Sequence, residues 1–230
     1  MGDNGKMAHT TLPPWRSVLA VVAHPDDESF GLGAILDAFV QAGARVHVLC
    51  LTRGEASTLQ GVEGDLSQLR EGELKEAARL LGAEGVTLLD FPDGELAEVG
   101  LSELTAPVTA AATTLRATGL IGFDSSGVSG HPDHVRATAA AIAAGAELDL
   151  PVLGWTLPAT ITEVLFQEFG VPFTGHTPGQ IDIELSVDRT RQSEAVQAHP
   201  SQAVPGSVLW RRLELQGGTE YLRWLYRPDG

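Results

Sequence analysis

The chain has 230 residues, 43% of them hydrophobic and 20% charged, so it can bury a core, and wholesale disorder is excluded. Its 30 acidic and 15 basic residues give a formal net charge of −15, which argues against nucleic acid and anionic membrane surfaces as partners, because clustered cations bind both. The single cysteine excludes an intrachain disulfide and a cysteine-rich zinc site, and no apolar stretch reaches the roughly 20 residues that span a bilayer.

The N-terminal segment, residues 1–15, is polar, contains prolines and has no apolar signal-peptide core. We predict that this segment is a loose leader and that residues 16–230 form a single domain. A cytoplasmic location is the default expectation for such a chain.

Strands and helices are predicted to alternate from residue 17 to residue 157. Short β-branched apolar runs predict strands, and apolar residues at helical spacing predict helices. In chain order these are strand 17–23, helix 29–42, strand 45–52, helix 66–81, strand 85–91, helix 101–117, strand 120–123, helix 131–144 and strand 152–157. This alternation predicts an α/β fold with a parallel sheet covered by helices.

The remaining residues, 158–230, are less regular. We predict a strand at 181–187, a helix at 188–199, and a hairpin whose arms, 208–216 and 219–226, flank Gly217-Gly218. No regular element is assigned between 158 and 180.

Ligands of parallel α/β sheets bind beyond the carboxyl ends of the strands. That rule points to three loops, at residues 23–33, 52–64 and 124–134.

Two of these loops carry a His-Pro-Asp sequence. The first contains His24, Asp26 and Asp27, and the second contains His131 and His134. A single His-Pro-Asp is typical of a helix N-terminus, where Asp caps free N–H groups and Pro fits the first turn. Two such loops at one sheet edge would crowd five ionisable groups together, and a metal ion offsets that cost. Two imidazoles and a carboxylate suit Zn²⁺ with an open position for water, and they also suit Fe²⁺.

Residues 23–28, Ala-His-Pro-Asp-Asp-Glu, together with residues 131–134, His-Pro-Asp-His, resemble the LmbE-like, or PIG-L, family of zinc-dependent de-N-acetylases. Further similar blocks lie at 51–55, at 70–82, at Asp93-Gly94 and at 199–202, in the same order as in the family. The resemblance implies a Rossmann-like three-layer sandwich with a mostly parallel sheet and no dinucleotide.

The resemblance also implies roles for the two loops. His24, Asp27 and His134 match the zinc ligands, one zinc ion being expected per chain. Asp26 matches the general base that accepts a proton from water, and a bound dication is expected to depress the pKa of its carboxyl. His131 matches the group that stabilises the oxyanion, which we expect to be an imidazolium.

Arg70 and Asp93 match positions that hold the substrate in relatives, and Arg53 is a third candidate, either for an anionic substrate group or for a salt bridge. Asp133 is expected to orient a histidine or to cap a helix. Ser129 stands where some relatives carry a tyrosine that helps to bind the oxyanion. Glu28 and His199 are expected to have supporting roles.

The implied activity is metal-dependent hydrolysis of an N-acetyl group from a small-molecule substrate of the N-acetylglucosamine type. One alternative is another amide or carbamoyl hydrolase on the same zinc site, such as a thiol S-conjugate amidase. A more distant one is a non-catalytic metal- or nucleotide-binding Rossmann protein, for which the glycine pattern at Gly31 and Gly33 lacks a third glycine. Whether the chain forms a homo-oligomer is left open.

Overall fold

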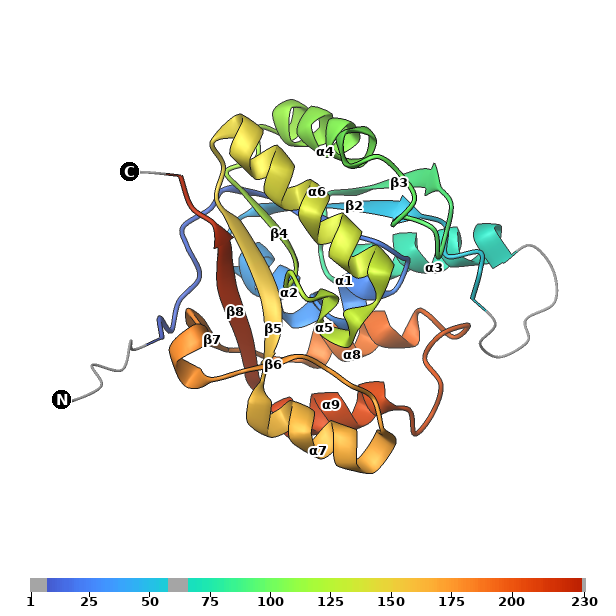
Figure 1. The fold of residues 1–230 in the computed structure, drawn as a ribbon, viewed down its shortest axis with the longest axis vertical. Coiled ribbons are helices and arrows are strands. Elements are labelled where there is room, and N and C mark those ends of the chain that lie inside the picture. The colour runs from blue at the N-terminus through green and yellow to red at the C-terminus, as the bar shows by residue number, and fades with distance from the viewer. Residues whose placement is uncertain (1–7, 58–65, 229–230) are drawn as a thin grey trace.

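A computed structural model describes residues 8–57 and 66–228 of the chain. Within these residues, eight strands belong to one sheet, whose main path runs in the order β3-β2-β1-β4-β5-β8-β7 (Figure 1). The strands are β1 (Ser17–Val22), β2 (Arg45–Thr52), β3 (Gly85–Phe91), β4 (Gly119–Phe123), β5 (Val152–Pro158), β6 (Gly175–His176), β7 (Ile183–Ser186) and β8 (Thr219–Tyr226). Strands β1 to β5 run parallel, and β8 lies antiparallel between β5 and β7.

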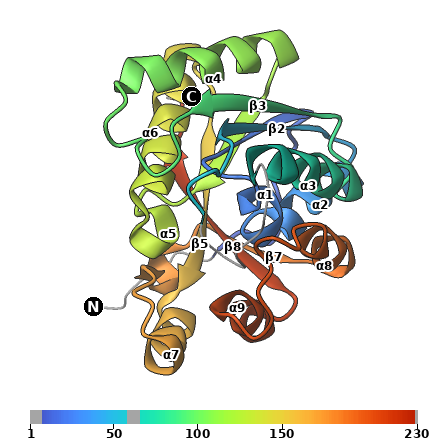
Figure 2. The ribbon, with the colours of Figure 1, turned by 90° about the vertical axis from the view of Figure 1, so that its right-hand side faces the viewer.

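Helices cover both faces of this sheet, which gives the three layers seen in Figure 2. Helices α4 and α6 pack against each other and against β1 on one face, while α2, α3 and α8 lie on the other. The helices are α1 (Asp27–Phe30), α2 (Gly33–Gln41), α3 (Leu66–Leu80), α4 (Leu101–Leu115), α5 (Gly127–Gly130), α6 (Pro132–Leu148), α7 (Ala159–Phe169), α8 (Thr190–Gln197) and α9 (Val208–Gln216), with a 3₁₀ turn, η2, at Pro178–Gln180.

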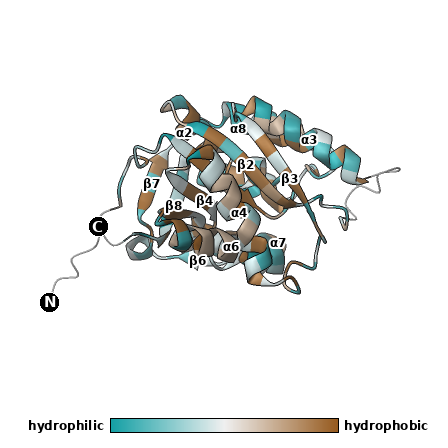
Figure 3. Cartoon of the chain, turned by 90° about the horizontal axis from the view of Figure 1, so that it is seen from above, coloured by the Kyte–Doolittle hydropathy of each residue, from teal (hydrophilic) through white to brown (hydrophobic). Residues whose placement is uncertain are grey.

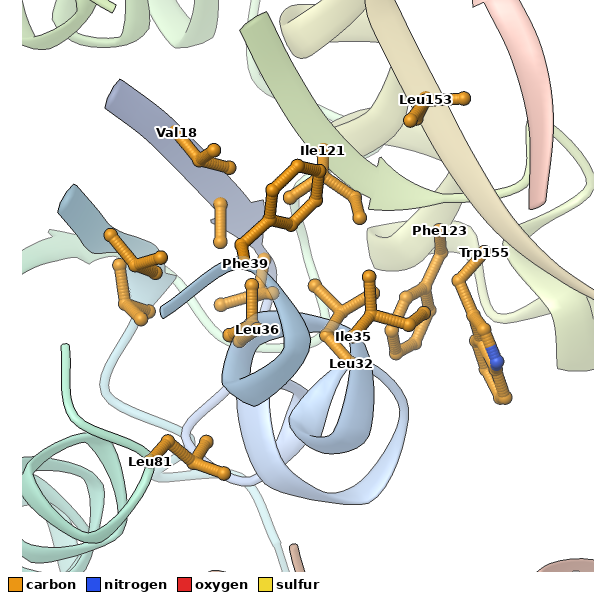
Figure 4. Close-up of a cluster of buried hydrophobic side chains, with 14 of the residues drawn as sticks. Val18, Leu32, Ile35, Leu36, Phe39, Leu81, Ile121, Phe123, Leu153 and Trp155 are labelled. Carbon is orange, nitrogen blue, oxygen red and sulfur yellow. The ribbon is translucent and has the colours of Figure 1, made fainter. Parts of the chain in front are cut away.

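Two apolar cores separate the layers. Residues of β1 alternate between them, so that Val18 faces the α2 side and Leu19 faces the α4–α6 side, and all six residues of β1 are buried. On the first side, Ile35 and Phe39 of α2 point toward the sheet (Figure 4). Strands β2 and β3 are largely apolar in Figure 3, whereas much of α3 is hydrophilic. Strands covered on both faces have such continuous apolar sequences.

The strand order places the end of β1 beside the end of β4. From β1 the chain moves outward through β2 and β3, and it then returns to pair β4 with the other edge of β1. Such a reversal opens a crevice beyond the carboxyl ends of the two strands. The loops that follow β1 and β4 are the two His-Pro-Asp loops, so the topology brings them together.

The α/β fold with a mostly parallel sheet confirms the sequence prediction, but several elements differ from it. The predicted hairpin arm 208–216 is wrong, because this segment is helix α9, and β8 pairs with β5 and β7 instead. Helix α7 occupies part of 158–180, where no element was assigned. The predicted helix 29–42 is two helices, α1 and α2, which are separated at Gly31-Leu32.

The described part of the predicted leader, residues 8–15, lies against the domain. His9 forms a bridge with Ile183 of β7 through two backbone hydrogen bonds of 2.8 Å. The ring of Trp15 stacks on Phe39, with 5.5 Å between the ring centroids. Residues 8–15 are therefore not loose, contrary to the expectation from their composition; residues 1–7 lie outside the described residues, and the division into a leader and a single domain stays a prediction.

No helix within the described ranges has the length and apolar character needed to cross a bilayer.

Candidate metal and catalytic site

The loop after β1 turns sharply between its two aspartates. Asp26 has a φ of 113°, a conformation that side-chain-bearing residues rarely adopt, and helix α1 begins at the next residue. The Asp27 carboxylate folds back, and its Oδ2 accepts hydrogen bonds from the N–H groups of Ala23 (3.1 Å) and His24 (2.9 Å). Adjacent carboxylates thus have separate surroundings, which allows them separate roles.

The loop after β4 leads into helix α6. His131 caps this helix, because its Nδ1 accepts a hydrogen bond of 3.2 Å from the N–H of Asp133, and Pro132 occupies the first turn. His134 follows in the same turn. The capping role expected of a His-Pro-Asp sequence is therefore present, but histidine rather than aspartate is the cap.

His24, Asp27 and His134 meet although 110 residues separate the two histidines. His24 Nδ1 lies 3.2 Å from His134 Nε2, Asp27 Oδ1 lies 3.2 Å from the same Nε2, and Asp27 Oδ2 lies 3.7 Å from His24 Nδ1. Ligand atoms that are each about 2.1 Å from a tetrahedral zinc ion lie about 3.4 Å from one another. The spacing of the three side chains fits that geometry.

Hydrogen bonds behind the two imidazoles fix their orientation. His134 Nδ1 lies 3.2 Å from the carbonyl oxygen of Gly127, so it donates there. His24 Nε2 lies 3.2 Å from Asp133 Oδ2 and 3.1 Å from Asp93 Oδ1, so it donates to carboxylates. In the neutral rings the lone pairs of His24 Nδ1 and His134 Nε2 face each other at 3.2 Å, and a proton or a metal ion between them relieves their repulsion. Carboxylates and carbonyls behind a ligating histidine are usual in metal sites.

Asp133 thus orients His24, which was one of its two expected roles. Its side chain is fully buried and also accepts the N–H groups of Gly94 (2.8 Å) and Leu96 (3.1 Å). A second set of possible ligands, His24, His131 and Asp133, is also close enough to hold an ion. That set is the poorer one, because His131 Nδ1 and both Asp133 oxygens already accept backbone hydrogen bonds.

The electrostatics of the cluster favour a cation. Burial alone would lower the pKa of His24, but hydrogen bonds to Asp133 and Asp93 and the charges of Asp27 and Asp26 raise it to about 10. Burial would also lower the pKa of His134, but the charge of Asp27 and its hydrogen bond to His134 raise it. The pKa of the Asp27 carboxyl is lowered despite its burial, mainly by the charge of His134. Surroundings that attract a proton so strongly also attract a metal ion.

Asp26 lies beside this cluster and is held by Arg70. Arg70 Nη2 donates to Asp26 Oδ2 at 2.9 Å, and the Asp26 side chain is 17% exposed. Burial raises the pKa of Asp26 to about 7; Arg70 opposes this shift and Asp27 adds to it. The surroundings within the protein therefore raise the pKa of Asp26, whereas a bound dication is expected to depress it. A carboxylate with a pKa near the working pH suits a general base.

A buried network supports Asp26 from the other side. Glu28 accepts the Asp26 N–H at 2.9 Å, and its second oxygen lies 2.7 Å from His199 Nε2. Glu73 in turn accepts the N–H (3.0 Å) and the hydroxyl (2.6 Å) of Ser201. Burial would lower the pKa of His199, but Glu28 raises it, and the two side chains lie at ion-pair distance. These contacts fit the supporting roles expected of Glu28 and His199.

His131 is exposed, and its ring lies across that of His24 with 5.0 Å between centroids. Burial, His134 and His24 lower its pKa. Because its Nδ1 accepts the Asp133 N–H, the ring carries a proton on Nε2. The lowered pKa and this contact favour a neutral ring over the expected imidazolium, and either form can donate Nε2–H to an oxyanion.

The three predicted substrate contacts lie in different surroundings. Asp93 lines the cavity described below, but Oδ1 binds His24 and Oδ2 accepts the Ala56 N–H at 2.8 Å. Arg70 is 3% exposed, and besides Asp26 it donates to the carbonyl oxygens of Pro25 and Gly54. Both residues therefore contact the catalytic loops, and their contact with substrate stays a prediction.

Arg53 is not among the residues that line the cavity. Its guanidinium binds Asp90 (2.7 Å) and Glu71 (2.6 Å) on the protein surface. Of the two roles expected for Arg53, contact with an anionic substrate group or a salt bridge, the structure shows salt bridges.

We expect the substitution Arg70→Met to lower kcat by about 10- to 100-fold and to change KM much less, because loss of a charged hydrogen bond costs about 1.5–3 kcal/mol. The guanidinium orients Asp26 and two loop carbonyls rather than a bound ligand. Steady-state kinetics of Arg70→Met and of the matched surface variant Arg53→Met measure this, and the latter is expected to stay within about 2-fold of the parent. A rise in KM alone in Arg70→Met would assign Arg70 to substrate binding instead.

A cavity of about 740 Å³ opens over the cluster. His24, Asp26, Asp27, His131 and His134 all line it. Its other walls include Phe123, Trp155 and Arg212, which the sequence analysis did not assign to the site. Trp155 also belongs to the apolar core on the α2 side, and Arg212 carries no local sequence signal of a site, since only the fold brings α9 to the cavity.

The chain is similar to known proteins in sequence and in fold. The family model of PIG-L, the GlcNAc-PI de-N-acetylase, matches residues 19–145. The chain is 29% identical over 233 residues to the 1D-myo-inositol 2-acetamido-2-deoxy-alpha-D-glucopyranoside deacetylase of Mycolicibacterium vanbaalenii, with 80% of each chain covered. It is 30% identical over 217 residues to the probable N-acetyl-alpha-D-glucosaminyl L-malate deacetylase 2 of Bacillus anthracis, with 92% of each covered.

Among solved structures, the zinc-inhibited form of a teicoplanin deacetylase superposes with a TM-score of 0.71 at 21% identity, covering 90% of this chain and 97% of the other. That likeness concerns the fold. The sequence relatives are deacetylases, which confirms the predicted enzyme class, an N-deacetylase. The extent of the family match and of these alignments shows that the chain belongs to the PIG-L, or LmbE-like, family.

Proposed function

We propose that the protein is a zinc-dependent hydrolase that removes the N-acetyl group from a small-molecule substrate of the N-acetylglucosamine type. The observation that carries this proposal is the set of three side chains at tetrahedral spacing, with the unligated carboxylate of Asp26 beside it at the base of a cavity. The deacetylases to which the chain is similar act on acetamido sugars according to their names, which supports the choice of substrate.

His24, Asp27 and His134 would hold the metal. A zinc ion bound there lowers the pKa of water and polarises an amide carbonyl. Fe²⁺ is the other ion that the same donor set suits.

The chain's own groups then handle the protons and the developing charge. The Asp26 carboxylate takes a proton from the attacking water, and Arg70 keeps it in position. The amide nitrogen needs that proton to leave as an amine, so Asp26 delivers it as the C–N bond breaks. His131 donates its Nε2–H to the carbonyl oxygen as that oxygen gains charge, which a neutral imidazole can do. Ser129 also lines the cavity, in the place of the tyrosine of some relatives.

Treatment with a chelator is expected to abolish acetate release from N-acetylglucosamine derivatives, and added Zn²⁺ is expected to restore it at about one ion per chain. Elemental analysis before and after treatment, with an assay for free acetate, measures both quantities and distinguishes Zn²⁺ from Fe²⁺. Acetate release that persists in metal-free protein would contradict the proposal. Cleavage of other amide bonds without release of acetate, such as the amide bond of a thiol S-conjugate, would favour the alternative hydrolase on the same site.

A cytoplasmic location, the absence of a nucleic-acid partner and the oligomeric state stay predictions.

A further inference from the structure

The cavity is lined by apolar side chains as well as by the metal and catalytic ones. These are Phe30, Phe173, Val204, Val208 and Leu209, which come from α1, the segment after α7, the loop between α8 and α9, and the start of α9. An acetamido sugar alone is polar and would leave this apolar surface unfilled. Ligand pockets of this kind bind apolar groups and fix their orientation through a few polar contacts.

A row of rings runs from the proposed metal ligand His134 to Arg212. The ring of Phe123 lies 4.8 Å from that of His134, and the ring of Trp155 lies 5.1 Å from that of Phe123. Phe123 and Trp155 are side by side in Figure 4. The guanidinium of Arg212 then lies 4.8 Å from the centre of the Trp155 ring. All four residues line the cavity, so the row is continuous from the metal site to Arg212.

Arg212 is buried, 4% exposed, and its hydrogen bonds go to uncharged acceptors, the carbonyl oxygen of Phe30 and the side chain of Gln216. Among the described residues no carboxylate lies within ion-pair distance of it. The carboxylate of Glu220, whose charge acts on Arg212 from a greater distance, is paired with Arg189 and also accepts hydrogen bonds from Trp155 and Gln216. Burial lowers the pKa of Arg212 to about 10.

The other buried arginine in the described ranges has the partner that Arg212 lacks. Arg70 binds the Asp26 carboxylate at 2.9 Å. A buried charge without a counter-ion is costly to the folded protein. An unpaired cation in a ligand cavity is therefore a candidate for binding an anion that arrives with the ligand.

We propose that the preferred substrate is an acetamido sugar joined to an apolar segment that ends in an acidic group. The apolar segment lies along Phe123 and Trp155, and the acidic group pairs with Arg212. This inference rests on the proposed deacetylase function and adds the class of group attached to the sugar. A merely structural Arg212, which ties α9 to α1 through Phe30, is the alternative to be excluded.

The test compares two substrates that differ in one charged group, the phenyl and the 4-carboxyphenyl glycosides of N-acetylglucosamine. For the zinc-loaded native chain, kcat/KM for acetate release is expected to be about 10- to 100-fold higher with the carboxyphenyl glycoside, as for a charge-assisted hydrogen bond. In Arg212→Met this preference, the ratio of the two kcat/KM values, is expected to fall to about 1. Arg212→Lys, which keeps the charge, is expected to retain part of the preference.

Equal kcat/KM for the two glycosides in the native chain would overturn the inference and leave the proposed function standing. An equal loss with both substrates in Arg212→Met would assign Arg212 a structural role and would also overturn it. Acetate release from neither substrate would contradict the proposed function itself.

In that case, calorimetry of the same two glycosides with chelator-treated native and Arg212→Met protein decides the role of Arg212, because binding needs neither turnover nor metal. A preference for the acid that Arg212→Met loses supports the inference, and its absence overturns it.

Discussion

The substitution Asp26→Asn is expected to lower kcat by at least ~100-fold while the chain keeps its zinc, because the amide cannot accept a proton as the carboxylate does. Asparagine is the better test than alanine. Its side-chain oxygen can still accept the hydrogen bond from Arg70, and asparagine tolerates the positive φ of this position better than other side chains do. Assays of acetate release, zinc content and thermal unfolding measure the kcat, the metal binding and the stability of the variant.

A zinc content and melting temperature close to those of the parent would show that the loss is chemical. Asp26→Asn with normal turnover would contradict the assignment of Asp26 as the general base. A variant that loses zinc together with activity would instead place Asp26 among the metal ligands, at variance with the separate surroundings of Asp26 and Asp27.

The second large effect is expected on metal binding. His134→Ala removes one of the three side chains at tetrahedral spacing, and we expect zinc affinity to fall at least ~100-fold, the upper end of what loss of an outer-sphere partner causes. His131→Ala is the matched control, since this residue belongs to the same loop and lines the same cavity. It is expected to keep its zinc and to lower kcat. Zinc titration against a competing chelator measures both variants.

The opposite pattern, with zinc lost in His131→Ala and kept in His134→Ala, would favour the alternative ligand set of His24, His131 and Asp133. Loss of zinc in both variants would indicate that His131 also ligates the ion. The proposed assignment requires the two histidines, three positions apart, to differ.

The catalytic loops could be predicted from the sequence because their position follows from general rules. Strands of a parallel sheet end at one edge, and His24 and His134 each follow a strand at that edge. The pairing of β1 with β4 makes these ends neighbours, and the distance of 3.2 Å between the two ring nitrogens agrees with that expectation. Of the partners behind the imidazoles, Asp133 was expected. Gly127 and Asp93 could not be predicted in this role, since Gly127 acts through its backbone carbonyl and Asp93 comes from a third loop.

The C-terminal part was harder to predict. Gly217-Gly218 suggested a hairpin, but Leu209, Arg212 and Gln216 recur at helical spacing and form the buried face of α9. Helix α7 lies between Pro158 and Gly170, a start and stop signal that could have identified it. An arginine on the buried face of a short helix departs from the apolar pattern usual for such a face, and Arg212 in the structure lines the cavity.

The walls of the cavity come from two separate stretches of the chain. The residues proposed for metal binding and proton transfer lie within 19–145, the span of the family model, whereas Trp155, Phe173, Leu209 and Arg212 lie after it. Most of the proposed recognition residues thus lie in another segment than the reaction residues, although Phe123 lies within the first stretch and His199, which pairs with Glu28, within the second. Substitutions in the C-terminal segment that keep His199 could therefore change the aglycone that is accepted without replacing a metal-binding or proton-transfer residue.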